Sequence, residues 1–105
     1  MRLSYVFLLT LVSLFIASIT AHAQTGRIAG TIVDGETGDP LFSASVLVVE
    51  TSSGAVADFD GNYLIKGLEP GTYTLRVSYI SFATQTITDV VVVDGEVTSI
   101  DVAMQ

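Results

Sequence analysis

The sequence contains no cysteine and no tryptophan, and its only histidine is His22. No disulfide can therefore support the fold, and no cysteine is available to carry a lipid. From residue 24 onward the chain has neither histidine nor cysteine. Ser-His and Cys-His nucleophilic pairs are thus excluded there, as are the nitrogen and sulfur ligands that zinc prefers. The sequence predicts a protein that is not an enzyme and needs no cofactor.

Basic side chains are also scarce. After residue 23 there are three of them, Arg27, Lys66 and Arg76, against eleven carboxylates, so the formal charge of this part is −8. Repulsion from phosphate disfavours nucleic acid and anionic lipid as partners. We therefore expect any membrane association to be indirect, through a protein partner or a fused domain.

The first residues form a separate unit. Arg2 precedes a mostly apolar stretch, residues 3–19, and Ala21-His22-Ala23 places small residues at both positions that a signal peptidase reads. The pattern predicts a signal peptide over residues 1–23 and one domain over residues 24–105. An uncleaved membrane anchor is the alternative, although the apolar stretch is short for a spanning helix.

Short alternating segments separated by Gly, Pro and Asp fill the rest of the chain, and none of them requires a helix. Strands are expected at residues 27–34, 44–50, 55–58, 62–66, 72–79, 83–93 with a break near Asp89, and 97–104 after a hairpin turn at Asp94-Gly95. The alternation assigns these side chains to the core: Ile28, Gly30 and Ile32; Ala44, Val46 and Val48; Tyr73, Leu75, Val77 and Tyr79; Thr98, Ile100, Val102 and Met104. About seven short strands predict an all-β fold, an antiparallel β-sandwich, with a small barrel as the alternative.

Carboxylates are grouped at Asp58-x-Asp60-Gly61-Asn62. Gly61 can take the positive φ of a tight turn, and aspartates beside such a turn accept backbone N–H bonds. The same spacing makes Asp58, Asp60 and Asn62 weak calcium candidates. Calcium needs about six to eight oxygen ligands, and the next acid is Glu69, so a hairpin turn is favoured and no metal is assigned.

Aromatic side chains could bind sugar rings by stacking. The alternation directs Tyr63, Tyr73 and Tyr79 toward the core and leaves Phe42, Phe59 and Phe82 near loops. Phenylalanines in such places more often fill the open ends of a sandwich. Carbohydrate binding therefore remains a secondary hypothesis.

Two runs of valine and leucine, residues 46–49 and 90–93, are apolar on both faces of their strands. One interpretation is that Leu47, Val49, Val91 and Val93 form a surface that docks on another protein, a role that an open strand edge could share. The alternative is that both runs are central strands covered on both sides.

An ordered set of motifs spans residues 26–104. The motifs are Gly30-x-Ile32-x-Asp34, Thr37-Gly38-Asp39-Pro40-Leu41-x-x-Ala44-x-Val46 and Asp58-x-Asp60-Gly61-x-Tyr63-x-Ile65-x-x-Leu68-x-x-Gly71-x-Tyr73-x-Leu75. In this order they resemble the carboxypeptidase regulatory-like domain, a transthyretin-like β-sandwich of secreted bacterial proteins. Ser43 and Ser81-Phe82 depart from the family pattern, which usually has glycine before the alanine and Gly-Tyr after the strand ending at Tyr79.

The resemblance implies a function without catalysis. Such domains form the periplasmic N-terminal extension of TonB-dependent outer-membrane receptors, or are appended to metallocarboxypeptidases whose catalytic residues lie in another domain. We therefore expect an exported accessory or interaction module, in the periplasm or at the periplasmic face of the outer membrane. A stand-alone relative, a carbohydrate-binding module and a domain of a secreted metallocarboxypeptidase are the alternatives.

The signal-peptide pattern leads to the first prediction, that export removes residues 1–23. Mass spectrometry of the exported protein should show Gln24, free or cyclised, as the first residue. An intact Met1 in the membrane fraction would contradict cleavage and support the anchor.

Overall fold

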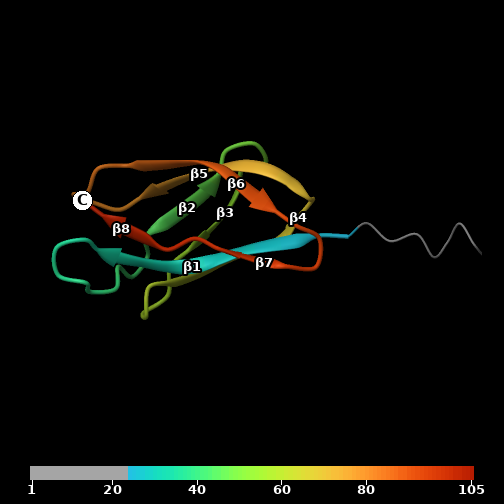
Figure 1. Ribbon diagram of the computed structural model, residues 1–105. Helices are drawn as coiled ribbons and strands as arrows, with labels where there is room; N and C mark the ends of the chain where they lie inside the picture. Colours follow the sequence, from blue (N-terminus) through green and yellow to red (C-terminus); the bar gives the residue numbers. More distant parts are fainter. Residues whose placement is uncertain (1–23) are drawn as a thin grey trace, which may run out of the picture.

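The computed structural model describes residues 24–105, which form eight strands and no helix (Figure 1). The predicted signal peptide lies outside the described residues. In chain order the strands are β1 (Gly26–Asp34), β2 (Ser45–Val48), β3 (Ser53–Val56), β4 (Asn62–Leu68), β5 (Gly71–Ser78), β6 (Gln85–Val92), β7 (Val97–Ser99) and β8 (Val102–Met104). Across residues 24–105 there is thus no helix with the length and apolar character needed to cross a membrane.

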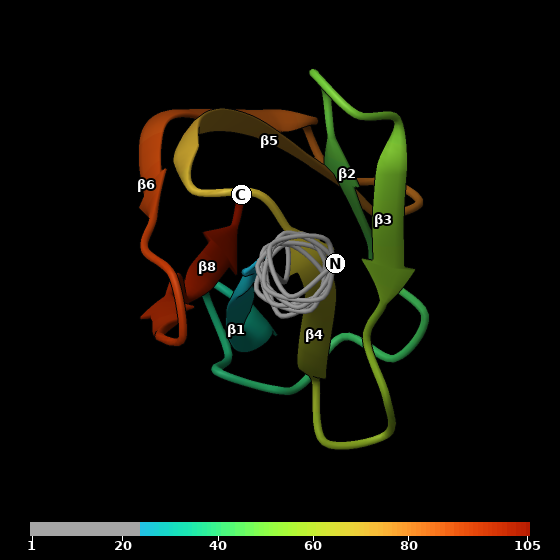
Figure 2. The ribbon, with the colours of Figure 1, turned by 90° about the vertical axis from the view of Figure 1, so that its right-hand side faces the viewer.

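The strands form two sheets that face each other (Figure 2). In one sheet β1 is central, with β4 on one side and β7 and then β8 on the other. The other sheet has the order β3-β2-β5-β6. The predicted β-sandwich is confirmed. The pairing is not antiparallel throughout, because the chain crosses between the sheets after β6 and runs back beside β1 in the same direction.

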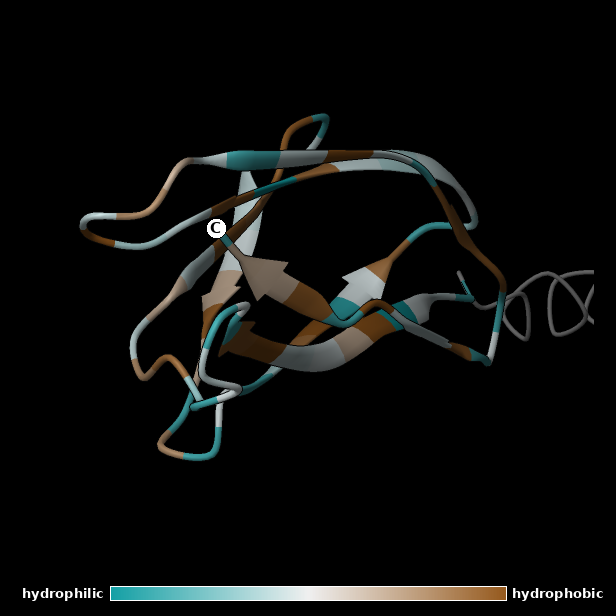
Figure 3. Ribbon diagram, turned by 60° about the vertical axis from the view of Figure 1, so that its left-hand side comes forward, coloured by the Kyte–Doolittle hydropathy of each residue, from teal (hydrophilic) through white to brown (hydrophobic). Residues whose placement is uncertain are grey.

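The core lies between the sheets and is built by alternate side chains of the strands. Figure 3 shows that each strand contains hydrophobic residues, coloured brown, among more hydrophilic ones. Its largest fully buried side chains come from both layers: Ile28, Ile32, Val46, Val48, Leu75, Val77, Val92 and Met104. These positions confirm the predicted inward direction in the first, second, fifth and last strands, although Gly30 and Thr98 of the predicted sets are only partly buried. Tyr73, Tyr79 and Ile100 are only partly buried and pack against the edge of the core. A core of this kind follows from period-two burial, since alternate side chains point to opposite faces.

The break predicted near Asp89 is a β-bulge. Leu75 pairs with Ile87 and Tyr73 pairs with Val90, so two residues of β6 oppose the single residue Thr74. Asp89 adopts φ 59°, the left-handed region that a bulge requires. The extra residue shifts the inward positions from odd to even, so that Val90 and Val92 are buried. A strict alternation through this segment would have placed them outside.

The predicted last strand is interrupted at Ile100 and Asp101, where β7 ends and β8 begins. Ile100 N donates to Ala29 O at 2.9 Å, and its carbonyl lies directly over Gly30. A Cβ at position 30 would overlap that carbonyl oxygen, so only glycine fits. At the next position along β1 the Thr31 N–H donates to the Asp101 Oδ1 at 3.0 Å. The side chain of Asp101 thus takes the place of the backbone carbonyl that would accept this bond in a regular ladder.

The turn predicted at Asp94-Gly95 forms, but the hairpin does not. Gly95 has φ 71°, and Glu96 N donates to Val93 O at 3.1 Å. The strands on either side then pair with different partners, β6 with β5 and β7 with β1. The hairpin prediction was wrong because the turn signal is local, whereas the free side of β1 decides where β7 pairs.

Because of the directions in which the strands run, several loops lie together at one end of the sandwich, away from the end where β1 begins (Figure 1). They are residues 35–44 after β1, residues 57–61 before β4, residues 79–84 between β5 and β6, and the C-terminal Gln105. Backbone hydrogen bonds connect them, from Ser43 N to Ala57 O at 2.9 Å and from Ala83 N to Gln105 O at 3.1 Å. These loops are therefore tied to one another across the two sheets.

Two serines in these loops have left-handed backbone conformations. Ser43 has φ 70° and Ser81 has φ 71°. Residues with a Cβ are disfavoured there by about 1–2 kcal/mol. Both are positions at which the sequence departs from the glycine of the resembled family, and at both of them this chain holds a residue with a side chain in a conformation that favours glycine.

The alternation in β5 leads to the second prediction. Leu75 is fully buried and Thr74, on the opposite face, is not. Leu75→Ala should lower the free energy of unfolding by about 2–5 kcal/mol, whereas Thr74→Ala should cost much less because its backbone bond to Glu50 survives. Urea denaturation measures both. Similar, small losses would mean that the inward face of β5 has been misassigned.

The strained serines lead to the third prediction. Replacing Ser43 or Ser81 with glycine should release strain, partly offset by about 0.4–1 kcal/mol from the more flexible unfolded chain. We expect a net gain of a few tenths to about 1 kcal/mol for each in thermal or urea unfolding. Ser78→Gly, in an ordinary strand conformation at the end of β5, is the matched control and should destabilise. Destabilisation in all three variants would show that the loops carry no releasable strain.

Candidate functional site

Three large apolar side chains are exposed at the end that carries these loops. Phe42 is 47% exposed, Phe59 is 78% exposed and Ile80 is 82% exposed. Each comes from a different loop, and the hydrogen bond between Ser43 and Ala57 holds the first two loops together. We call this surface, formed by Phe42, Phe59, Ile80 and the loops at residues 35–44, 57–61 and 79–84, the aromatic end.

Phe42 and Phe59 stack on each other outside the core. Their ring centroids are 4.2 Å apart and the rings are parallel within 1°. The expectation that these phenylalanines fill the open end of the sandwich was wrong for both. Phe82 behaves as expected, since it is partly buried and meets Tyr79 edge to face at 5.7 Å. Phe59 is 78% exposed and stacks on Phe42 with one ring face, which leaves its other ring face open to solvent.

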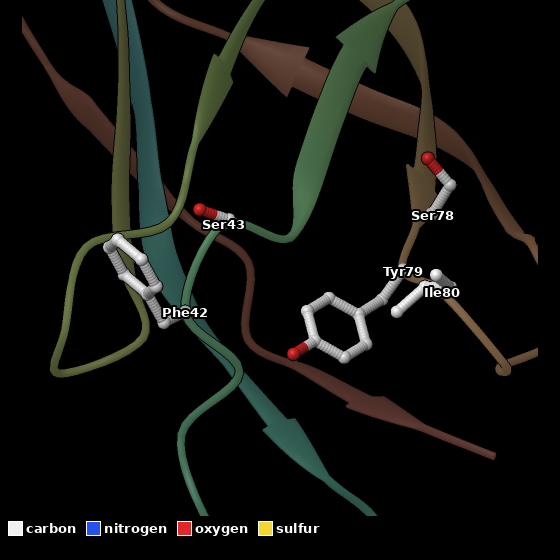
Figure 4. A pocket seen from close by; sticks show the side chains of 5 residues that line it. All are labelled: Phe42, Ser43, Ser78, Tyr79 and Ile80. Carbon is white, nitrogen blue, oxygen red and sulfur yellow. The ribbon is translucent and has the colours of Figure 1, made fainter.

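A pocket of about 440 Å³ opens beside the stack. Phe42 and Ser43 form one wall, and Ser78, Tyr79 and Ile80 form the other (Figure 4). Ligand pockets typically have volumes of about 300–1,000 Å³, with apolar walls and a few polar groups. This pocket is therefore large enough to receive side chains of a partner.

The charge around the aromatic end is strongly negative. The loops at residues 35–44, 57–61 and 79–84 contain no lysine, arginine or histidine. Carboxylates lie in or directly beside two of these loops: Asp34, Glu36, Asp39, Asp58 and Asp60. Arg27 and Lys66 lie toward the other end, and Arg76 lies on the outer face of β5 opposite Leu47. Among the described residues the loops of this end thus combine exposed apolar side chains with carboxylates and carry no basic side chain.

The calcium candidates form the tight turn between β3 and β4. Asp58 Oδ1 accepts the N–H groups of Asp60 at 3.0 Å and Asn62 at 2.9 Å, and Gly61 N donates to Asp58 O at 2.9 Å. Gly61 has the positive φ, 79°, that the sequence indicated. Within residues 24–105 no group of three His, Cys, Asp or Glu side chains is placed to hold a metal ion. Calcium binding at Asp58, Asp60 and Asn62 stays an untested hypothesis.

The four candidate docking residues lie on the second sheet. Val49 is 38% exposed, Val91 54% and Val93 44%, and Leu47 is half-buried. Their neighbours Val46, Val48, Val90 and Val92 are buried, so each run has one face in the core and the other outside. On the outer face Leu47 pairs with Arg76, and Val91 with Thr72. Polar side chains of β5 therefore separate the two runs, and docking through them stays a prediction.

Two ionisable groups with shifted pKa values are bound to the backbone. Tyr63 is buried and its hydroxyl donates to Ile100 O at 2.5 Å. Burial, together with the nearby charge of Asp101, raises the pKa of Tyr63 to about 12. The carboxylate of Glu50 accepts the Thr74 N–H at 2.8 Å, and this bond lowers the pKa of Glu50. Both groups therefore support strands, and neither faces the pocket.

Sequence reasoning missed the joint exposure of Phe42, Phe59 and Ile80. Two local signals could have indicated it. Phe59 stands between two aspartates in a turn, where a side chain has little core to reach, and Ile80 follows the inward Tyr79 and so takes the outward position. The sheet topology brings these three side chains to one end of the sandwich, and local sequence features do not predict that topology.

Comparison with protein families and known proteins gives one consistent result. The carboxypeptidase regulatory-like domain model matches residues 27–105. The TonB-dependent receptor P3 of Formosa agariphila is 36% identical over 76 residues, which cover 70% of this chain and 8% of the receptor. The TonB-dependent receptor SusC of Bacteroides thetaiotaomicron is 35% identical over 78 residues, which cover 74% of this chain and 8% of that protein. The chain thus spans less than a tenth of the length of the receptors that it matches.

Solved structures share the fold. A cohesin–X-dockerin complex from Acetivibrio cellulolyticus matches with a TM-score of 0.62 and 22% identity, over 73% of this chain and 52% of the other. A putative carbohydrate binding protein from Bacteroides uniformis matches with a TM-score of 0.57 and 22% identity, over 74% and 40%. At these identities only the β-sandwich is shared. The family match covers nearly all described residues and therefore shows the family as well as the fold. This chain belongs to the carboxypeptidase regulatory-like domain family.

Proposed function

We propose that this chain is a non-catalytic interaction module of a TonB-dependent outer-membrane receptor, located in the periplasm as an N-terminal extension of the receptor or as a stand-alone relative. The observation that carries the proposal is the similarity of residues 27–105, as one domain, to a small part of several such receptors. A module of this size within a much longer protein acts through its surface, by contacts with the rest of the receptor or with another protein.

The chemistry of the domain supports a role without catalysis. Residues 24–105 have no histidine or cysteine to serve as a nucleophile or a general base. The nearest pair of carboxylates, Asp58 and Asp60, flanks a turn, and one oxygen of Asp58 is occupied by two backbone N–H groups. What the domain offers to solvent is an apolar pocket and an exposed aromatic pair, which suit binding.

Carbohydrate binding is the second candidate function. It is favoured by the open ring face of Phe59 and by the adjacent pocket, which has hydroxyl groups from Ser43, Ser78 and Tyr79 in its walls. Against it, five carboxylates surround this surface, and a neutral sugar gains little from them. We therefore rank a protein partner first.

The receptor role can be tested in the source bacterium. An antiserum raised against residues 24–105 should detect its antigen in the outer-membrane fraction, and cross-linking before lysis should join it to a TonB-dependent receptor, unless the receptor itself carries the domain. Reading the DNA after the codon for Gln105 distinguishes these two cases. Recovery of the antigen only from the cytosol, or of cross-links only to proteins other than receptors, would contradict the proposal.

The absence of catalysis leads to the fourth prediction. Peptidase and glycosidase assays on the purified chain should give background rates. Turnover that disappears in Asp58→Ala or Asp60→Ala would show that the turn carboxylates are catalytic and would overturn the non-catalytic role. Glu69→Ala, at an exposed turn on the other end of the sandwich, is the control for a general loss of stability.

A further inference from the structure

The aromatic end combines three features that point to a particular kind of partner. Phe42, Phe59 and Ile80 are exposed apolar side chains on three different loops. A pocket of about 440 Å³ lies between the wall formed by Phe42 and the wall formed by Tyr79 and Ile80. Five carboxylates lie in or directly beside two of its three loops, and none of the loops contains a basic residue. A binding surface with an apolar centre and a charged rim is typical of protein interfaces.

The negative charge of these loops distinguishes between three possible partners, which are an anionic membrane, a second copy of this chain and a cationic ligand. An anionic membrane would be repelled by Asp58 and Asp60, which flank Phe59. A second copy of this chain would bring two acidic ends together, which costs energy because like charges oppose each other. A cationic ligand is attracted by the same groups. Of the three occupants, only the last uses both the charge and the apolar centre.

We propose that the aromatic end docks a basic, apolar segment of a separate protein. An aliphatic side chain of that segment occupies the pocket between Phe42 and Tyr79. An adjacent arginine or lysine lies over the open face of Phe59, where an aromatic ring attracts a cation, and within reach of the carboxylates of Asp58 and Asp60. The inference rests on the proposed role as an interaction module and names the surface and the chemistry of its partner.

The loops are built in a way that suits this role. The backbone bond between Ser43 and Ala57 and the parallel stack of Phe42 on Phe59 hold two of the three loops in one arrangement before any partner arrives. Ser43 and Ser81, next to Phe42 and Ile80, keep left-handed conformations despite their side chains. A surface ordered in advance loses less entropy when it binds.

The fifth prediction tests the partner's chemistry with a defined probe. A synthetic peptide of leucine and arginine residues in alternation is titrated into the purified chain and followed by amide chemical shifts in a ¹⁵N–¹H spectrum. We expect shifts confined to residues 35–44, 57–61 and 79–84, and affinity that falls as salt is added. Peptides with glutamate in place of arginine, or serine in place of leucine, should bind at least about tenfold more weakly.

Matched variants separate the aromatic end from the rest of the surface. Phe59→Ser with Ile80→Ser should weaken binding about tenfold or more, as the loss of a central apolar contact does, while the melting temperature stays close to that of the parent because both side chains are exposed. Glu36→Gln with Asp60→Asn should weaken binding and reduce its salt dependence. Val97→Ser with Glu96→Gln, the same kinds of change near the other end, should have no effect.

Several outcomes would overturn the inference. They are no binding of the arginine peptide, equal binding of the glutamate peptide, shifts centred on Leu47 and Val91, dimerisation through these loops, or shifts in these loops with a neutral oligosaccharide but not with the peptide. The receptor role is tested independently by cross-linking. If cross-linking to a receptor succeeds and the peptide fails, only the assignment of this surface falls; if the peptide binds and no receptor is found, the receptor proposal falls.

Discussion

The close approach of the Ile100 carbonyl to Gly30 is the constraint on which the rest of the structure depends. At this point β7 ends and β8 begins, and β1 must pair with both of them on one side while pairing with β4 on the other. Glycine at position 30 leaves room for the carbonyl. The same oxygen accepts the Tyr63 hydroxyl, and Asp101 completes the ladder to Thr31. The first sheet is therefore joined through one crossing, where these five residues meet.

Because the first sheet is held together at this crossing, the loops of the aromatic end are not needed to join its strands. The core is filled by alternate side chains of both layers, and Tyr79 and Phe82 close the loop-bearing end from inside. Phe42, Phe59 and Ile80 are exposed at the same end, where Phe42 and Ile80 line a pocket. Exposed apolar side chains in loops that also carry carboxylates and strained residues are the reason why we propose this end as the docking surface.

The motifs of the carboxypeptidase regulatory-like family separate the residues that specify the fold from the exposed apolar residues of the aromatic end. The family's sequence motifs fall on the turn at Asp58, on the inward residues of the strands and on the glycine under Ile100, all of which specify the sandwich. The exposed apolar side chains of the aromatic end, Phe42, Phe59 and Ile80, lie outside those motif positions, whereas the carboxylates of Asp39, Asp58 and Asp60 lie within them. A substitution at these three apolar positions would therefore leave the family motifs of this chain unchanged.

Local patterns in the sequence determined most strands, the inward faces of β1, β2, β5 and β8, a break near Asp89 and the turn at Gly61, since each depends on near neighbours and on period-two burial. Only the tertiary structure decided that β7 pairs with β1 instead of β6, and that Phe42, Phe59 and Ile80 meet at one end. The physical reason is the same in both cases. Which edges pair and which loops come together depends on contacts between distant residues across two sheets, and a pattern of near neighbours does not record them.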